Sequence, residues 1–237
     1  MRRQSAAALL CAALFFSACG SDPAPETSSA DSVPDPGQEI SFVTSDDLQL
    51  EGRQWGDGAE YVILAHMRPA DMASWFDFAR VLADEGYTAL AFNFRGYGES
   101  EGVEGDFDVA ADVRAAVAAA FDDGAQRVHL IGASIGGTGA VAASADNVIG
   151  ATITLSAPDA FEGVNAIELV RDQVDNPILL IAAEEDGTAA VDAAAIVAEA
   201  SGNAELVVLS GAQHGTNLFA EHGDELTTLI LEFLAAA

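Results

Sequence analysis

The sequence predicts an α/β fold, in which helices cover both faces of a mostly parallel β-sheet. Short apolar runs alternate along the chain with longer helical stretches. The connections between them are short, which favours right-handed β–α–β units with neighbouring parallel strands. One run, Tyr61–Ala65, is apolar at every position, as expected of a strand that is buried on both faces.

The predicted elements follow one another from an antiparallel entry hairpin to a C-terminal helix. Ile40–Val43 and Leu48–Trp55 alternate in polarity around a turn and predict the hairpin. Between the apolar runs that end at Leu155 and begin at Ile178 lie only 22 residues, too few for a large lid domain. With Tyr61–Ala65, the pattern predicts about eight strands. The later elements are helix Ala73–Glu85, strand Tyr87–Phe94, helix Val109–Phe121, strand Val128–Ile131, helix Ile135–Ala145, strand Val148–Leu155, strand Ile178–Ala182, helix Ala189–Ala200, strand Glu205–Leu209 and helix Asn217–Leu234.

The charge of the chain excludes some classes of partner. The 237 residues are 50% hydrophobic, enough to bury one sizeable core. The 38 acidic residues face only 9 basic ones, all of them arginines, and the net charge is -29. Phosphate backbones would repel this chain, so we expect no nucleic-acid partner. The same charge opposes electrostatic docking on anionic lipid.

The N-terminus has the pattern of an export signal. Two arginines precede the apolar run Ala6–Phe16, which has the length of a signal peptide core and is too short to span a bilayer. The segment Phe16-Ser17-Ala18-Cys19-Gly20 resembles the bacterial lipobox, with Phe16 where an aliphatic residue is usual. We therefore expect residues 1–18 to be a signal peptide and Cys19 to carry lipid, including palmitate. The alternative is a plain secretory signal cleaved near Ala18.

A polar segment separates this signal from the folded part. Residues 19–38 are rich in Ser, Pro, Asp and Gly, which predicts a disordered tether after the lipidated cysteine. The folded domain is expected to span residues 39–237. The protein would then lie in the cell envelope, bound to the lipid bilayer through Cys19, and we expect it to be a monomer.

A nucleophile motif follows one of the predicted strands. Gly132-Ala133-Ser134-Ile135-Gly136 stands between strand Val128–Ile131 and a helix rich in small residues. A serine in this strand–turn–helix context occupies a strained backbone, and its neighbours two before and two after must lack side chains. The backbone N–H of Ile135 would then point at a developing oxyanion. The alternative is a tight glycine-rich turn with an idle serine.

At this motif the chain resembles the α/β-hydrolase family, over residues 40–237. The resemblance is to small, nearly lidless serine members, including the branch similar to dienelactone hydrolases, where the nucleophile is often Cys. The family order of nucleophile, acid and histidine implies Ser134, Asp186 after strand Ile178–Ala182, and His214 after the last strand. The adjacent Glu184 and Glu185 are alternatives for the acid.

The resemblance also implies the second oxyanion donor and several structural residues. His66 matches the family loop after strand Tyr61–Ala65, but Met67 replaces a glycine. The implied donor is the backbone N–H of Arg68, with that of Met67 as the alternative, since Pro69 has none. His66 is interpreted as fixing this loop. Asn93 replaces the aspartate of a family turn in which Arg95 is interpreted as structural; His129 is read as structural and His222 as solvated.

These residues predict a serine hydrolase that cleaves small-molecule carboxylic esters or thioesters through an acyl-enzyme. The mechanism needs no cofactor and no metal, and the sequence has no signature for either. Two other functions use the same fold: a catalytically inactive envelope binding lipoprotein, and an acyltransferase with the same three residues. The sequence does not discriminate hydrolase from acyltransferase, and Met67 mildly favours the inactive protein.

Overall fold

The computed structural model describes residues 35–146 and 148–237. The predicted signal peptide, Cys19 and most of the predicted tether lie outside these residues. Within them, Asp35 already belongs to the folded unit, because its backbone carbonyl accepts hydrogen bonds from the indole N–H of Trp55 at 3.1 Å and from Nε of Arg80 at 2.8 Å.

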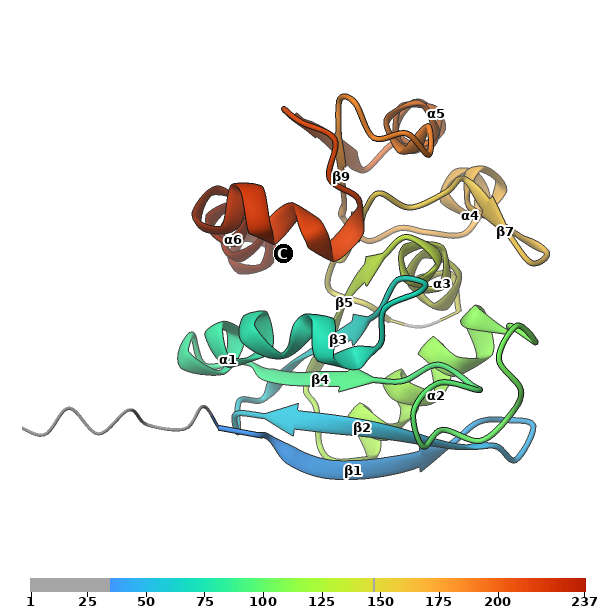
Figure 1. Ribbon diagram of the computed structural model, residues 1–237, viewed down its shortest axis with the longest axis vertical. Helices are drawn as coiled ribbons and strands as arrows, with labels where there is room; N and C mark the ends of the chain where they lie inside the picture. Colours follow the sequence, from blue (N-terminus) through green and yellow to red (C-terminus); the bar gives the residue numbers. More distant parts are fainter. Residues whose placement is uncertain (1–34, 147) are drawn as a thin grey trace, which may run out of the picture. The chain divides into compact units, whose positions relative to one another are not determined.

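One eight-stranded sheet organises the described residues, in the order β1-β2-β4-β3-β5-β6-β9-β10 (Figure 1). The strands from β4 to β10 run parallel, while β1 pairs with β2 and β2 pairs with β4 in antiparallel fashion. The expected mostly parallel sheet of about eight strands is therefore confirmed. The bounds are β1 Gln38–Val43, β2 Gln49–Trp55, β3 Glu60–Ala65, β4 Thr88–Phe92, β5 Arg127–Ala133, β6 Thr152–Leu155, β9 Ile178–Ala183 and β10 Ala204–Leu209.

Helices cover both faces of this sheet, with α1 and α6 on one side and α2 to α5 on the other (Figure 1). Strand β3 shows why both faces are apolar. Val62 and Leu64 pack with residues of α1 and α6, while Ile63 and Ala65 pack with residues of α2 and α3. The helices are α1 Phe76–Asp84, α2 Val109–Asp122, α3 Ile135–Ser144, α4 Ala166–Asp172, α5 Ala190–Ala200 and α6 Leu218–Ala236, with short 3₁₀ turns η1 Met72–Trp75 and η2 Gly215–Asn217.

Two predicted elements differ from the observed ones. The strand predicted from Val148 begins only at Thr152, and Val148 itself is 90% exposed. The helix predicted from Ala73 begins as the turn η1, where the Asp71 carboxylate caps the N–H of Ala73, before α1 starts at Phe76. Apolar composition alone did not show where backbone pairing begins or where the helix changes its hydrogen-bond pattern.

The segment between β6 and β9, here called the cap, packs against α3 and α5. It contains a two-stranded hairpin, β7 (Ala160–Phe161) and β8 (Val164–Asn165), followed by α4. The Asn165 side chain accepts from the N–H of Glu168 and starts the helix. Thr138 on α3 donates its hydroxyl to the carbonyl of Pro158 at 2.9 Å, which ties the cap to the helix that follows Ser134.

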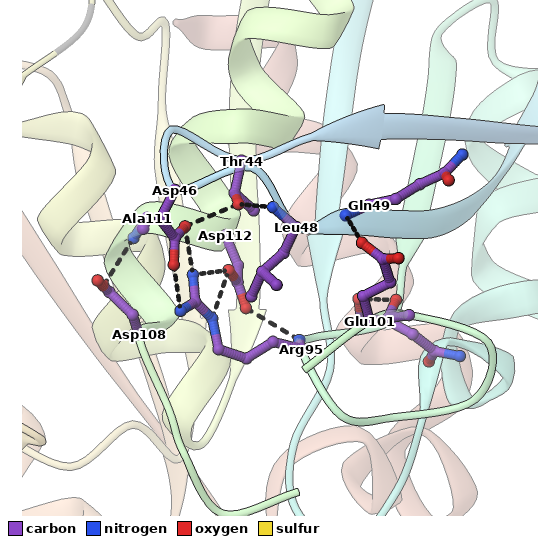
Figure 2. A network of polar contacts seen from close by, with 11 residues as sticks. Thr44, Asp46, Leu48, Gln49, Arg95, Glu101, Asp108, Ala111 and Asp112 are labelled. Atoms are coloured by element: carbon purple, nitrogen blue, oxygen red, sulfur yellow. Dashed lines mark hydrogen bonds and ion pairs between the residues drawn. The ribbon is translucent and has the colours of Figure 1, made fainter. Parts of the chain in front are cut away.

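A buried ion cluster ties the turn after β4 to the rest of the fold (Figure 2). The Arg95 guanidinium donates to Asp112 on α2 through Nε at 2.9 Å and Nη2 at 2.7 Å, and to Asp46 in the β1–β2 turn. The second Asp112 oxygen accepts the Arg95 backbone N–H at 3.0 Å. Asp112 is fully buried and Arg95 nearly so. Arg95 thus joins three segments, in agreement with its predicted structural role.

Within the described residues, no helix combines the length and apolarity needed to cross a bilayer.

Candidate active site

Ser134 lies in the sharp turn between β5 and α3, with a strained backbone. Its φ of 50° and ψ of -121° are unusual for a residue with a side chain. The flanking glycines leave room for the turn: a Cβ at Gly132 would lie 2.2 Å from the carbonyl oxygen of Gly136, and a Cβ at Gly136 would lie 2.4 Å from that of Ala65. The turn therefore has the geometry that the motif predicts, and it presses against the end of β3.

Asp186 and His214 lie side by side at the carboxyl ends of neighbouring strands. Asp186 follows β9 and His214 follows β10, and these strands pair in parallel. Oδ2 of Asp186 is 2.7 Å from Nδ1 of His214. The Asp186 side chain is 1% exposed and that of His214 is 24% exposed. Nε2 of His214 has no hydrogen-bond partner among residues 35–146 and 148–237. The histidine is thus anchored at one nitrogen and open at the other.

Thr188 holds the other oxygen of Asp186, a contact that the sequence analysis missed. Its backbone N–H donates to Oδ1 at 3.0 Å and its hydroxyl donates to the same atom at 2.7 Å. Burial acts to raise the pKa of Asp186, but the donors from Thr188 and His214 hold it below its usual value. An aspartate two residues before a threonine is typical of a side-chain turn, so Asp186-Gly187-Thr188 was a readable signal.

The loop of His214 lies against the turn of Ser134. A Cβ built on Gly215 would lie 3.3 Å from Cβ of Ala133 and 2.6 Å from the sulfur of Met67. Gly215 adjoins His214 and Ala133 adjoins Ser134, so the two chain segments are in contact. Among the hydrogen bonds of the described residues, none joins Ser134 directly to His214.

His66 fixes the loop that follows β3. The N–H of Phe94 donates to Nε2 of His66 at 3.1 Å, so the ring hydrogen is on Nδ1, which donates to the carbonyl of Met67 at 2.8 Å. Burial lowers the pKa of His66 and favours this neutral ring. The carbonyl and N–H of a trans peptide point in opposite directions, so the Arg68 N–H points away from His66.

Three backbone N–H groups around Ser134 remain available for an oxyanion. Those of Ile135, Arg68 and Met67 have no hydrogen-bond partner within the part of the chain that the structure describes. The clamp on the Met67 carbonyl gives the Arg68 N–H a defined direction, which favours it over that of Met67. The substitution of glycine by Met67 leaves this loop packed, since Met67 is only 6% exposed and contacts Gly215.

Asn93 occupies the position where the family turn has an aspartate, and the structure explains the change. Its Nδ2 donates to Oε1 of Glu51 at 2.5 Å, and its Oδ1 accepts the N–H of Met72 at 2.8 Å. The same Glu51 oxygen accepts the N–H of Glu99. An aspartate here would place a second carboxylate against Glu51, whereas the amide supplies the donor that Glu51 needs.

The other two histidines, and the aromatic residues Trp75 and Phe76, have structural positions. His129 is buried on β5, where Nε2 lies 3.2 Å from Glu60. His222, predicted to be solvated, is partly exposed: its side chain is 11% exposed, and Nε2 lies 2.9 Å from the carbonyl oxygen of Ser210, which ties α6 to the end of β10. Trp75 is fully buried in the core, and Phe76 packs on Trp55 at 4.9 Å between ring centroids.

Comparison with known sequences identifies the family. Residues 62–182, just over half of the chain, match the profile described as "Alpha/beta hydrolase family". The chain is therefore a member of the α/β-hydrolase family. A search among curated proteins finds no relative of this chain.

Several solved structures share the fold at low sequence identity. An esterase from Pyrococcus furiosus is 21% identical, with 84% of this chain and 91% of that chain covered and a TM-score of 0.74. An esterase from Rhodococcus sp. is 19% identical, with 83% and 98% covered and a TM-score of 0.70. A thermophilic esterase from Thermogutta terrifontis is 18% identical, with 84% and 99% covered and a TM-score of 0.68.

Proposed function

We propose that this protein is a serine esterase that hydrolyses small-molecule carboxylic esters or thioesters. The observation that carries the proposal is the anchored Asp186–His214 pair, whose histidine Nε2 has no partner among the described residues, together with a serine at positive φ in the adjoining segment. Family membership and the esterase activity of the Pyrococcus furiosus, Rhodococcus and Thermogutta terrifontis proteins support ester substrates. Fold alone does not establish activity, so the proposed activity depends on the residues of the site.

The reaction would begin with transfer of the Ser134 hydroxyl proton to Nε2 of His214. Oγ of Ser134 attacks the ester carbonyl carbon, and the resulting oxyanion accepts hydrogen bonds from the N–H groups of Ile135 and Arg68. Asp186 holds Nδ1 and stabilises the imidazolium. The tetrahedral intermediate then collapses, and His214 returns the proton to the departing alcohol or thiol.

A water molecule completes the cycle. Nε2 of His214 takes a proton from water, whose oxygen attacks the acyl-enzyme carbonyl. The second oxyanion is held by the same two N–H groups. Its collapse releases the carboxylic acid and returns the proton to Oγ of Ser134. If an alcohol attacked the acyl-enzyme in place of water, the same protein would act as an acyltransferase.

Labelling with a fluorophosphonate probe, together with hydrolysis of a panel of ester chain lengths, tests the proposal. The wild type should label, and Ser134→Ala should lose labelling and lower kcat by on the order of 10⁴ to 10⁶. Ser144→Ala is the matched control, because Ser144 lies at the far end of the same helix and, among the described residues, its hydroxyl bonds only the Val141 carbonyl. An unlabelled wild type would favour the inactive binding protein, and a fully active Ser134→Ala would overturn the assignment.

We further propose that the mature protein is a monomer anchored in the cell envelope by lipid on Cys19. The lipobox-like segment Phe16-Ser17-Ala18-Cys19-Gly20 supports this. Metabolic labelling with palmitate should mark the wild type, and Cys19→Ala should abolish the mark and release the protein from membrane fractions or leave the signal uncleaved. A wild type that is unlabelled and soluble would contradict the proposal.

A further inference from the structure

The side chain of Arg68 is exposed at the candidate site without a carboxylate partner. Among residues 35–146 and 148–237, Arg53, Arg80, Arg95 and Arg114 each pair with a carboxylate, and Arg68 does not. In a chain with 38 acidic and 9 basic residues, an arginine that stays unpaired is available to another anion. Arg127 and Arg171 are also without an ion pair, but they lie at the start of β5 and on α4.

The guanidinium of Arg68 lies over a cluster of aromatic rings formed by Phe107, Tyr97 and Phe161. Its Cζ lies 5.6 Å from the centroid of the Phe107 ring. Phe107 in turn contacts Tyr97 at 6.2 Å and Phe161 of the cap hairpin at 5.4 Å between ring centroids. A guanidinium stacked on an aromatic face keeps its N–H groups in the plane of the fork, where a carboxylate can accept two hydrogen bonds.

Two neighbouring segments connect these aromatic residues and Arg68 to the turn of Ser134. Arg68 follows Met67, which contacts Gly215 beside His214. Phe161 belongs to the cap that Thr138 ties to α3, the helix that starts after Ser134. The Arg68 guanidinium and the Arg68 backbone N–H belong to one residue, so they are separated by no more than the length of one arginine side chain.

A buried hydroxyl near Arg68 also lacks a partner. Tyr97 is 8% exposed, and its hydroxyl has no hydrogen-bond partner in the described part of the chain. Its ring packs on His66, two residues before Arg68, at 4.9 Å between centroids. Burial raises the pKa of this phenol, Glu104 adds to the rise, and Arg68 opposes it, so both charges act on this hydroxyl. An unpaired buried hydroxyl destabilises the fold unless a ligand supplies its hydrogen bond.

We propose that Arg68, assisted by the Tyr97 hydroxyl, binds a carboxylate on the substrate, so that the preferred substrates are anionic esters such as monoesters of dicarboxylic acids. This assignment rests on the proposed esterase function and names its substrate class. A site for an anion in so acidic a chain is physically reasonable, because charges beyond about 8 Å are screened at physiological salt while a direct guanidinium contact is not.

Selectivity between matched esters tests the proposal in the full-length protein. The measured quantity is the ratio of kcat/KM for monoethyl adipate to that for diethyl adipate, with 4-acetoxybenzoate and 4-acetoxybenzamide as a second pair that carries the charge on the alcohol side. The wild type should prefer the anionic member of a pair. Arg68→Gln should lower that ratio by on the order of tenfold to a hundredfold, as expected for loss of a charge-assisted hydrogen bond. Arg68→Lys should restore part of it.

Two variants distinguish direct binding of the substrate carboxylate from a general effect of losing one positive charge. Arg171→Gln removes the same charge from another unpaired arginine and should leave the ratio unchanged. Tyr97→Phe should lower the ratio a few-fold without lowering Tm, because the hydroxyl has no partner to lose in the free protein. Equal ratios for Arg68→Gln and Arg171→Gln would overturn the proposal, and an unchanged ratio in Tyr97→Phe would remove Tyr97 from the site.

Calorimetric titration of adipate into Ser134→Ala separates failure of this proposal from failure of the esterase function. Binding that is lost in the Ser134→Ala, Arg68→Gln double variant supports the anion site even if the wild type hydrolyses no ester. Hydrolysis of neutral esters with no adipate binding and no selectivity would overturn the anion site and leave the esterase function standing.

Discussion

Two buried aspartates in this molecule differ in how their hydrogen bonds are completed. Both oxygens of Asp112 accept from Arg95, whose remaining N–H groups reach Asp46, so the network is closed within the protein (Figure 2). One oxygen of Asp186 binds Thr188 and the other binds His214, and within the described part of the chain Nε2 of His214 has no partner. A closed network holds the fold together, whereas an open one can exchange a proton with a bound molecule.

Among variants that test this comparison of the two aspartates, Asp186→Asn should have the largest effect. Asparagine keeps the size and can still accept from Thr188, but it removes the charge that orients and stabilises the His214 ring. We expect kcat for ester hydrolysis to fall by on the order of 10⁴. The midpoint of thermal unfolding should change little. Steady-state kinetics and a thermal melt measure the two effects, and near-normal turnover would remove Asp186 from the mechanism and reopen Glu184 or Glu185.

Asp112→Asn should show the reverse pattern. It removes the negative charge that faces the buried Arg95 guanidinium and puts an NH2 donor against an N–H of Arg95. Breaking a buried ion pair costs about 3–5 kcal/mol of unfolding free energy. Urea unfolding measures this loss. The fraction that stays folded should keep its kcat. An Asp112→Asn variant that is as stable as the wild type but inactive would contradict the assignment of Asp112 to stability rather than catalysis.

Thr188→Val sharpens the comparison within the open network. Valine matches the shape of threonine but loses the hydroxyl that donates to Asp186, while the backbone N–H of residue 188 still donates. We expect kcat to fall by about tenfold to a hundredfold, since one hydrogen bond to a charged group contributes roughly 1.5–3 kcal/mol. Thr188→Ser should recover most of the activity. If Thr188→Ser is as slow as Thr188→Val, the hydroxyl has no positioning role.

The smallest effect concerns the dependence of stability on pH. Burial lowers the pKa of His66 and of His129, so the unfolded chain binds more protons than the folded one below about pH 6.5. Their contribution to stability is therefore complete above that pH and is lost as pH falls toward the folded-state pKa. The slope is at most about 1.4 kcal/mol per pH unit for each histidine.

Two variants show which histidines cause the change of unfolding free energy with pH. It is measured by urea unfolding between pH 7.5 and 5.5. His129→Gln should flatten it. The pKa of His222 is raised, chiefly by the Ser210 carbonyl, so His222 adds stability at low pH that is lost as pH rises, and His222→Gln should steepen the loss in acid. A slope that neither variant changes would show that other groups carry it.

Local sequence determined the parts of this protein that depend on neighbouring residues. The apolar run at β3 predicted a strand buried on both faces, because a parallel sheet covered by helices has no polar face. Gly132 and Gly136 around Ser134 predicted the strained turn, because only glycine fits where a Cβ would meet backbone atoms. The eight-stranded fold followed from the order of such elements.

Tertiary structure decided the contacts between residues that are distant in the chain. The sequence left Asp186 beside two glutamates as alternatives, and only the parallel pairing of β9 with β10 brought its carboxylate to His214. The sequence did not explain why Asn93 replaces the aspartate of the family turn. The fold does, because it places Glu51 against the Asn93 amide. His222 was expected in solvent, but the packing of α6 turned it toward Ser210. Periodicity specifies which face of an element is buried, and the atom that a polar side chain meets there depends on how separate elements pack.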